Sequence, residues 1–178
     1  YLYGDIDINE YLNILDNEFL SNFEYKEPPK PNKVVVNDNI DINIHYNTKS
    51  KNILTAAFNT GSSNDITKCT MLGVLSTLLC YTEGGNIKEA LLNNGLGDKV
   101  SCDFDDSGLS TILEITVENS DENNTYKFKK VLNDTFKDIA KNGVDDYKLK
   151  GVINSIKFFF KEEDFGYKPK GLFYGLLL

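Results

Sequence analysis

Few side chains in this chain of 178 residues could carry out chemistry. It has one histidine, His45, and three cysteines, Cys69, Cys80 and Cys102, with no CxxC pair among them. Because a zinc site usually takes three or four ligands at close spacing, a lone histidine on a predicted strand indicates a surface residue. Three scattered cysteines predict neither a zinc knuckle nor a disulfide framework.

A cysteine nucleophile is the alternative that these counts leave open. Cys102 falls on a predicted short strand, and a pair with His45 is geometrically conceivable. No pattern that would orient a base accompanies the pair, and Cys69 and Cys80 fall on a helix that is predicted to be buried. We therefore predict no catalytic residue within this chain.

Asp103, Asp105 and Asp106 form an acidic cluster that loosely resembles a calcium loop. The spacing lacks the later glycine and the closing glutamate of an EF-hand, so we expect a solvated turn. The glycines at 84–85 and 95–97 lack the lysine or third glycine of a phosphate loop. The sequence therefore predicts no nucleotide site.

The overall charge limits the partners of the chain. It has 19 basic and 27 acidic side chains, a net charge of −8 and no arginine. Nucleic-acid binding needs clustered cations and relies on arginine for base readout, so we expect no nucleic-acid partner. The longest apolar run, Met71 to Cys80, is well short of the ~20 residues of a membrane span, so we expect no membrane insertion.

The elements that hold these residues follow from residue periodicity. Apolar residues at three- and four-residue spacing predict an amphipathic helix over 9–22, and three of the four prolines predict an extended linker over 26–31. We therefore divide the chain into a tail of a preceding domain at 1–25, the Pro-rich linker at 26–31 and a second domain at 32–178. The non-Met start and the closing run of leucines indicate a piece of a longer protein, with the second domain truncated at its C-terminus.

The second domain is predicted to be α+β. Alternating polar and apolar residues predict strands at 34–36, 40–46, 53–58, 99–104 and 109–117. Helices are expected over 66–80, 86–93 and 122–141, and from about 145. We expect an antiparallel or mixed sheet with helices packed on one face.

Two segments carry a resemblance to a known family. LGVLSTLL at 72–79, followed by KEALLNNGLG at 88–97, resembles the second-domain signature of the presequence-protease branch of the pitrilysin/insulinase-type zinc metallopeptidases. The strand at 109–117 and the helices after it follow in that family's order, as do Tyr3-Gly4-Asp5 and the helix at 9–22. Within the branch the chain is most similar to the falcilysin-like members.

The resemblance implies a full-length zinc oligopeptidase, a monomer of two halves that close on short peptides. It places the zinc, two histidines, a distal glutamate and a glutamate general base in the earlier part of the first domain, outside this segment. Residues 1–25 would then end the catalytic domain, and 32–178 would be a non-catalytic second domain that is inactive alone. An organellar location (mitochondrion, plastid or digestive vacuole) is implied too.

The resemblance also implies one function for the segment itself. In this family an edge strand of the second domain lines the chamber and anchors the peptide by β-augmentation, which reads backbone rather than side chains. The strand in that place supplies the candidate substrate-binding residues Val100, Ser101, Cys102, Asp103 and Phe104. The acidic cluster beside it would favour basic peptides.

Three alternatives stay open at this point. The strand at 99–104 could be an ordinary sheet edge. The whole chain could be a structural, non-catalytic relative, such as a core subunit of a respiratory complex, or an independent α+β binding module. An intact inverted zinc motif upstream would decide for the enzyme.

Overall fold

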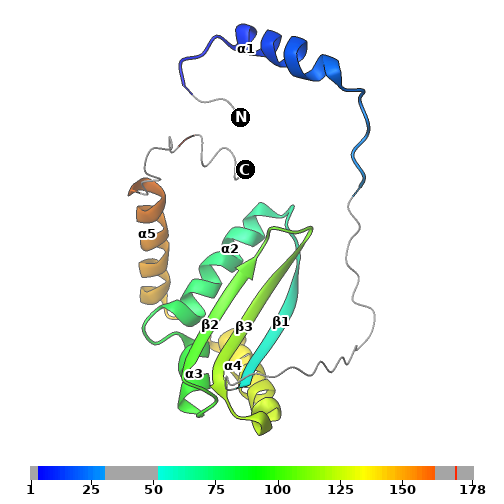
Figure 1. Cartoon of the computed structure of the whole chain (residues 1–178). Helices are drawn as coiled ribbons and strands as arrows, with labels where there is room; N and C mark the ends of the chain where they lie inside the picture. Colours follow the sequence, from blue (N-terminus) through cyan, green and yellow to red (C-terminus); the bar gives the residue numbers. More distant parts are fainter. Residues whose placement is uncertain (1–3, 31–51, 163–170, 172–178) are drawn as a thin grey trace. The chain divides into compact units, whose positions relative to one another are not determined.

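The computed structural model describes residues 4–30, 52–162 and 171 (Figure 1). The chain divides into two units, one made of Tyr1–Pro31 with Lys157–Leu178 and the other of Asn32–Ile156. The strands predicted at 34–36 and 40–46, and His45 with them, lie outside the described residues. The division into tail, linker and second domain stays a prediction.

The described N-terminal part of the first unit is helical. Helix α1 (Ile8–Ile14) continues as a π-helical turn, Leu15–Phe19, and a 3₁₀ turn, Leu20–Asn22, so the predicted helix over 9–22 is confirmed in extent. The Asp7 carboxylate caps α1 by accepting hydrogen bonds from the backbone N–H groups of the next turn. The apolar side chains of α1 and of the two turns that follow it are largely exposed.

Within residues 52–162, the second unit contains a three-stranded antiparallel sheet. Its strands are β1 (Asn52–Ser62), β2 (Lys99–Asp105) and β3 (Ser110–Ser120), in the order β1-β3-β2 (Figure 1). β3 is central because it pairs with both neighbours. The strands predicted at 53–58, 99–104 and 109–117 are therefore confirmed, and β2 lies at one edge of the described sheet.

The helices agree with the predicted ones to within a few residues. They are α2 (Ile66–Ser76) with the π-helical turn Thr77–Tyr81, α3 (Asn86–Asn93), and, after a 3₁₀ turn at Glu122–Asn124, α4 (Thr125–Asn142) and α5 (Asp146–Glu162). None of the helices within the described ranges is long and apolar enough to cross a bilayer.

Two local features bring the chain into β2. Gly95, with φ of +65°, ends α3 in a left-handed turn. The Gly95 N–H donates a hydrogen bond to the Leu92 carbonyl, and the Leu96 N–H donates one to the Leu91 carbonyl. Gly97 follows, where an added Cβ would collide with the Glu118 carbonyl oxygen and the Val117 side chain. Glycine at this position therefore lets the chain approach β3 closely.

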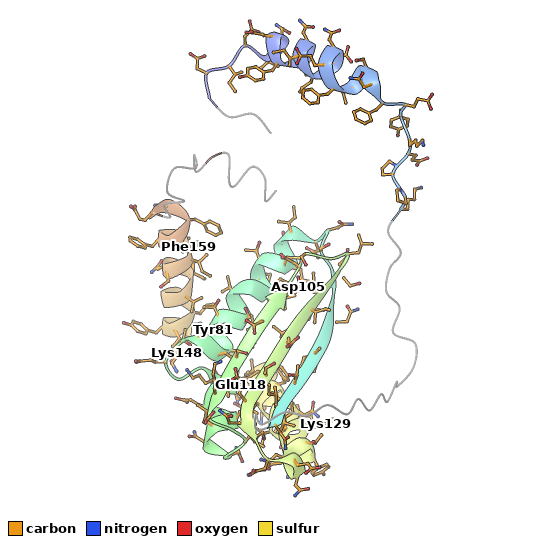
Figure 2. All side chains as sticks on the ribbon, viewed as in Figure 1. Tyr81, Asp105, Glu118, Lys129, Lys148 and Phe159 are labelled. Atoms are coloured by element: carbon orange, nitrogen blue, oxygen red, sulfur yellow. The ribbon has the colours of Figure 1, made fainter. Side chains whose placement is uncertain are left out.

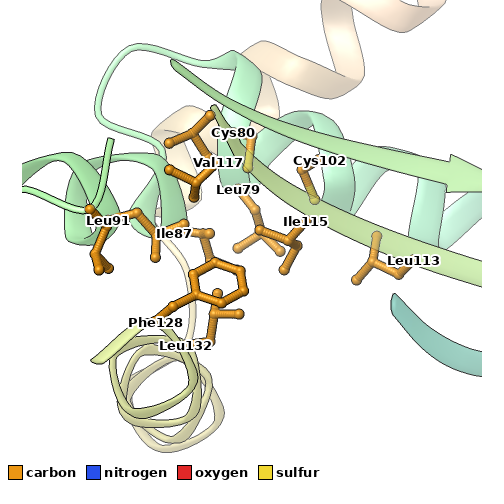
Figure 3. Close-up of a cluster of buried hydrophobic side chains, with 12 residues drawn as sticks. Leu79, Cys80, Ile87, Leu91, Cys102, Leu113, Ile115, Val117, Phe128 and Leu132 are labelled. Atoms are coloured by element: carbon orange, nitrogen blue, oxygen red, sulfur yellow. The ribbon is translucent and has the colours of Figure 1, made fainter. Parts of the chain in front are cut away.

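The core lies between one face of the sheet and the helices (Figure 3). Because side chains alternate along a strand, β2 and β3 direct every second residue to this face. The buried cluster consists of Leu79, Cys80, Ile87, Leu91, Leu96, Val100, Cys102, Leu113, Ile115, Val117, Phe128 and Leu132. The predicted α+β class, with helices packed on one face of an antiparallel sheet, is confirmed.

Candidate functional site

The free edge of β2 is the candidate site. β2 pairs with β3 along its whole length, with Ser101 opposite Thr116, Cys102 opposite Ile115 and Asp103 opposite Glu114. On its other side, no strand pairs with it in the part of the chain that the structure describes. An unpaired edge presents backbone N–H and C=O groups that another strand can bind.

The hydrogen bonds at the ends of β3 decide which backbone groups face that edge. Alternate residues of a central antiparallel strand turn their N–H and C=O to opposite neighbours. The Leu109 carbonyl accepts from Ser63 on the β1 side at 3.3 Å, and the Glu118 carbonyl accepts from Asp98 on the β2 side at 3.2 Å. Even-numbered residues of β3 therefore form backbone hydrogen bonds with odd-numbered residues of β2. The N–H and C=O groups of the even-numbered residues of β2 point away from β3, toward the free edge.

The five candidate residues predicted from the sequence all lie on β2, in two roles. Val100, Cys102 and Phe104 present backbone groups at the free edge, while their side chains face the helices. Ser101 and Asp103 pair with β3 through their backbone and place their side chains on the opposite face of the sheet. Whether these residues bind substrate stays a prediction.

The face of the sheet opposite the helices, hereafter the open face, is acidic. Its charged side chains are Lys99, Asp103, Asp105, Glu114 and Glu118. Lys99 forms an ion pair with Glu118 at 2.5 Å, and Asp103 lies directly opposite Glu114 in the strand register. Like charges opposite each other on neighbouring strands repel, so a cation near this pair would be stabilised.

The turn after β2 keeps the acidic cluster at the strand end. The Ser107 hydroxyl and backbone N–H both donate to the Asp105 carboxylate, at 2.6 and 2.9 Å. These hydrogen bonds lower the pKa of Asp105, and the bond from the Ser107 hydroxyl has the larger effect. The Asp105 carboxylate therefore stays ionised at neutral pH. Asp106 is exposed in the same turn.

Tyr81 and Glu114 are site residues that the sequence analysis missed. Tyr81 ends the π-helical turn after α2 (Figure 2). Its hydroxyl donates to the Asp103 carboxylate at 2.9 Å. Burial and the Asp103 carboxylate raise the pKa of the Tyr81 phenol, while the backbone N–H of Cys102 acts in the opposite direction.

Glu114 and Tyr81 were missed for different reasons. The alternation at 109–117 already indicated Glu114 on a polar face, but only the strand register brings it opposite Asp103. Tyr81 precedes Asp103 by 22 residues, and no spacing rule relates the two.

All three cysteines of the second unit are buried, and none forms a disulfide. Cys80 and Cys102 are both buried in the core, where contact with Cys102 and burial raise the pKa of the Cys80 thiol. Within the described ranges, no three or more His, Cys, Asp or Glu side chains are grouped to hold a metal.

An apolar groove of about 810 Å³ lies between α2 and the first turns of α5. Leu72, Leu75, Leu149 and Ile153 are among its lining residues, which are mostly apolar. The groove is a place for packing rather than for proton transfer or ionic recognition.

Comparison with known protein families shows which family the chain belongs to. The model of the peptidase M16 inactive domain matches residues 1–156. The chain belongs to the peptidase M16 inactive-domain family. The family predicted from the sequence is thus confirmed at the level of peptidase M16, as a non-catalytic segment of a zinc-protease family.

Three curated relatives of this M16 domain are similar over nearly its whole length. Protein HypA of Clostridium perfringens is 33% identical over 99% of the chain. Presequence protease 1 of Arabidopsis thaliana, chloroplastic/mitochondrial, is 27% identical over 97%, and the mitochondrial presequence protease of Danio rerio is 23% identical over 92%. The chain spans between 17% and 19% of the length of these relatives.

Two solved structures share the fold. The inactive peptidase domain of a zinc protease from Bordetella parapertussis has a TM-score of 0.60 at 13% identity, covering 74% of this chain and 68% of that one. An M16-like peptidase from Alicyclobacillus acidocaldarius has a TM-score of 0.54 at 16% identity, covering 86% of this chain and 37% of that one. At these identities the likeness concerns the fold alone.

Proposed function

We propose that this M16 domain is the substrate-anchoring segment of a zinc-dependent oligopeptidase of the presequence-protease branch. The observation that carries the proposal is the free edge of β2, where Val100, Cys102 and Phe104 present backbone groups beside an acidic face. A peptide in extended conformation adds to this edge as a further strand. Zinc and the catalytic residues belong to the remainder of the same chain.

The finer assignments follow from the same proposal. The full-length enzyme is a monomer that degrades short peptides in a closed chamber, and this segment forms part of the chamber wall. Its place among the falcilysin-like members of the branch stays a prediction. Similarity to the presequence proteases over at least 92% of the chain supports the branch.

Main-chain pairing suits an enzyme that accepts many sequences. Three outward-facing residues offer their N–H and C=O groups, and each hydrogen bond contributes about 0.5–1.5 kcal/mol net. Such an edge binds weakly and tolerates most side chains. The carboxylates of Asp103, Asp105 and Glu114 supply the preference, because they attract peptides rich in lysine or arginine.

The proposal is tested by binding of two short fluorescent peptides to the 178-residue chain. One alternates lysine with threonine, and the other alternates glutamate with threonine. The triple variant Asp103→Asn/Asp105→Asn/Asp106→Asn should weaken binding of the lysine peptide several-fold at low salt, and the loss should shrink near ~0.2 M salt. The glutamate peptide should not lose affinity.

The matched control is Asp121→Asn/Asp134→Asn/Asp138→Asn, which removes the same charge away from β2. It should leave the lysine peptide's affinity nearly unchanged. Amide NMR shifts should map the bound peptide to Val100, Cys102 and Phe104. Equal losses in the two triple variants, or shifts elsewhere on the domain, would contradict anchoring at β2 and favour a purely structural role.

A further inference from the structure

Charge is distributed unevenly along the open face beside β2. Every second residue of β2 directs its side chain to this face and lies opposite one residue of β3. These cross-strand pairs are Lys99 with Glu118, Ser101 with Thr116, Asp103 with Glu114, and Asp105 with Ile112. The two side chains of such a pair are close enough to act together on a residue that binds beside them.

Of the four cross-strand pairs, the two at the C-terminal end of β2 carry the net charge. In the first pair Lys99 forms an ion pair with Glu118, and the second pair is uncharged. The third pair presents two carboxylates, and the fourth presents one, that of Asp105. Negative charge is therefore concentrated at two positions that lie two residues apart along the free edge.

The helix-covered side of β2 offers no comparable charge. Helix α2 and the turn Thr77–Tyr81 pack against β2. Residues 66–81 contain no aspartate or glutamate, and Lys68 is their single charged side chain. A lysine of a bound strand that pointed toward this side would therefore meet no carboxylate from either element.

The geometry of an added strand connects these two observations. Side chains of the strand alternate between the open face and the helix-covered side. In antiparallel addition, the residues opposite Asp103 and Asp105 form no hydrogen bonds with them, because the backbone groups of these aspartates point toward β3. Side chains lie closest together in pairs of this kind. Two lysines separated by one residue can therefore both reach carboxylates, whereas only one of two adjacent lysines can.

We propose that the carboxylates of Asp103, Glu114 and Asp105 read the spacing of basic residues in a bound peptide and select two basic residues separated by one residue. The inference deepens the proposed function and rests on it, since it specifies which basic peptides bind best at the free edge of β2. The same carboxylates set the register of the peptide, because they lie at one end of the strand.

The experiment compares three short fluorescent peptides, each made of threonine with two lysines, so that composition and net charge are the same. The lysines are adjacent in the first, separated by one threonine in the second and by three threonines in the third. The 178-residue chain should bind the second peptide about two to five times more tightly than the other two at low salt. The third places both lysines on the open face, but only one of them beside a carboxylate.

Two variants test which side chains cause the preference. Asp105→Asn keeps an oxygen that can accept from the Ser107 N–H, and it should abolish the preference for the second peptide. Asp121→Asn, which removes the same charge away from β2, is the matched control and should keep the preference. Glu114→Gln, on the central strand, covers the case in which Asp105→Asn disturbs the turn. It should weaken all three peptides by a similar factor.

The outcomes separate the inference from the proposed function. Equal affinities for the three peptides, or a preference that survives Asp105→Asn, would overturn the inference. Amide shifts at Val100, Cys102 and Phe104 would in that case still support peptide anchoring at β2. If no lysine peptide bound, or if binding caused no shifts at these three residues, the proposed function would fail together with the inference.

Discussion

The two faces of the same sheet differ in what they do. On the helix-covered face, Cys102 and Ile115 are fully buried and form the centre of the core. One residue along the chain, Asp103 and Glu114 lie opposite each other on the open face. Strand alternation therefore separates the residues that stabilise the fold from those that would recognise a peptide, although they are neighbours in sequence.

Cys102 belongs to both regions. Its side chain packs in the core, while its backbone amide faces the free edge. The core thus positions the edge, and the recognition groups are main-chain atoms that almost any residue could supply. A site of this kind depends on the sequence only through packing, register and local charge.

The largest expected effect on stability comes from shortening a side chain on the buried face. Ile115→Ala should lower the free energy of unfolding by about 2–5 kcal/mol, because it leaves a cavity at the centre of the core. Ile112→Ala, on the open face and 39% exposed, should cost less than about 1 kcal/mol. Urea unfolding of both variants measures the difference; equal losses would show that the two faces do not differ as described.

A smaller effect concerns the pH dependence of the buried face. The contact with Cys102 and burial raise the pKa of the Cys80 thiol, so the folded state keeps a proton that the unfolded chain loses above about pH 8.5. The contribution of this group to stability should be constant below that pH and should fall as the pH rises above it.

The variant Cys80→Ala isolates this contribution. Its free energy of unfolding should fall less steeply with alkaline pH than that of the unmodified chain, when both are followed by urea unfolding. Cys69→Ala is the control, and it should keep the steeper slope. The same slope in Cys80→Ala and in the unmodified chain would rule out the thiol as its source.

The smallest effect is expected on the open face itself. The hydroxyl groups of Thr55 and Thr116 form a hydrogen bond of 3.0 Å across β1 and β3. A double-mutant cycle with Thr55→Val and Thr116→Val should give a coupling energy of about 0.2–1 kcal/mol. A coupling well above this range would mean that the open face contributes to stability much as the buried face does.

The amino-acid sequence by itself determined the elements and the fold class. Alternation at 109–117 indicated the strand that proves to be central, apolar periodicity indicated the helices, and two short segments pointed to the family. These features are local, because a strand or a helix end is specified by residues a few positions apart. The candidate strand at 99–104 was also identified from the sequence.

Only the tertiary structure decided what surrounds that strand. The register with β3 determines that Val100, Cys102 and Phe104 face outward and that Glu114 stands opposite Asp103. The packing of the turn at Thr77–Tyr81 brings the Tyr81 hydroxyl to Asp103. These contacts join residues far apart in the chain, and they depend on how the buried side chains pack together rather than on any local spacing.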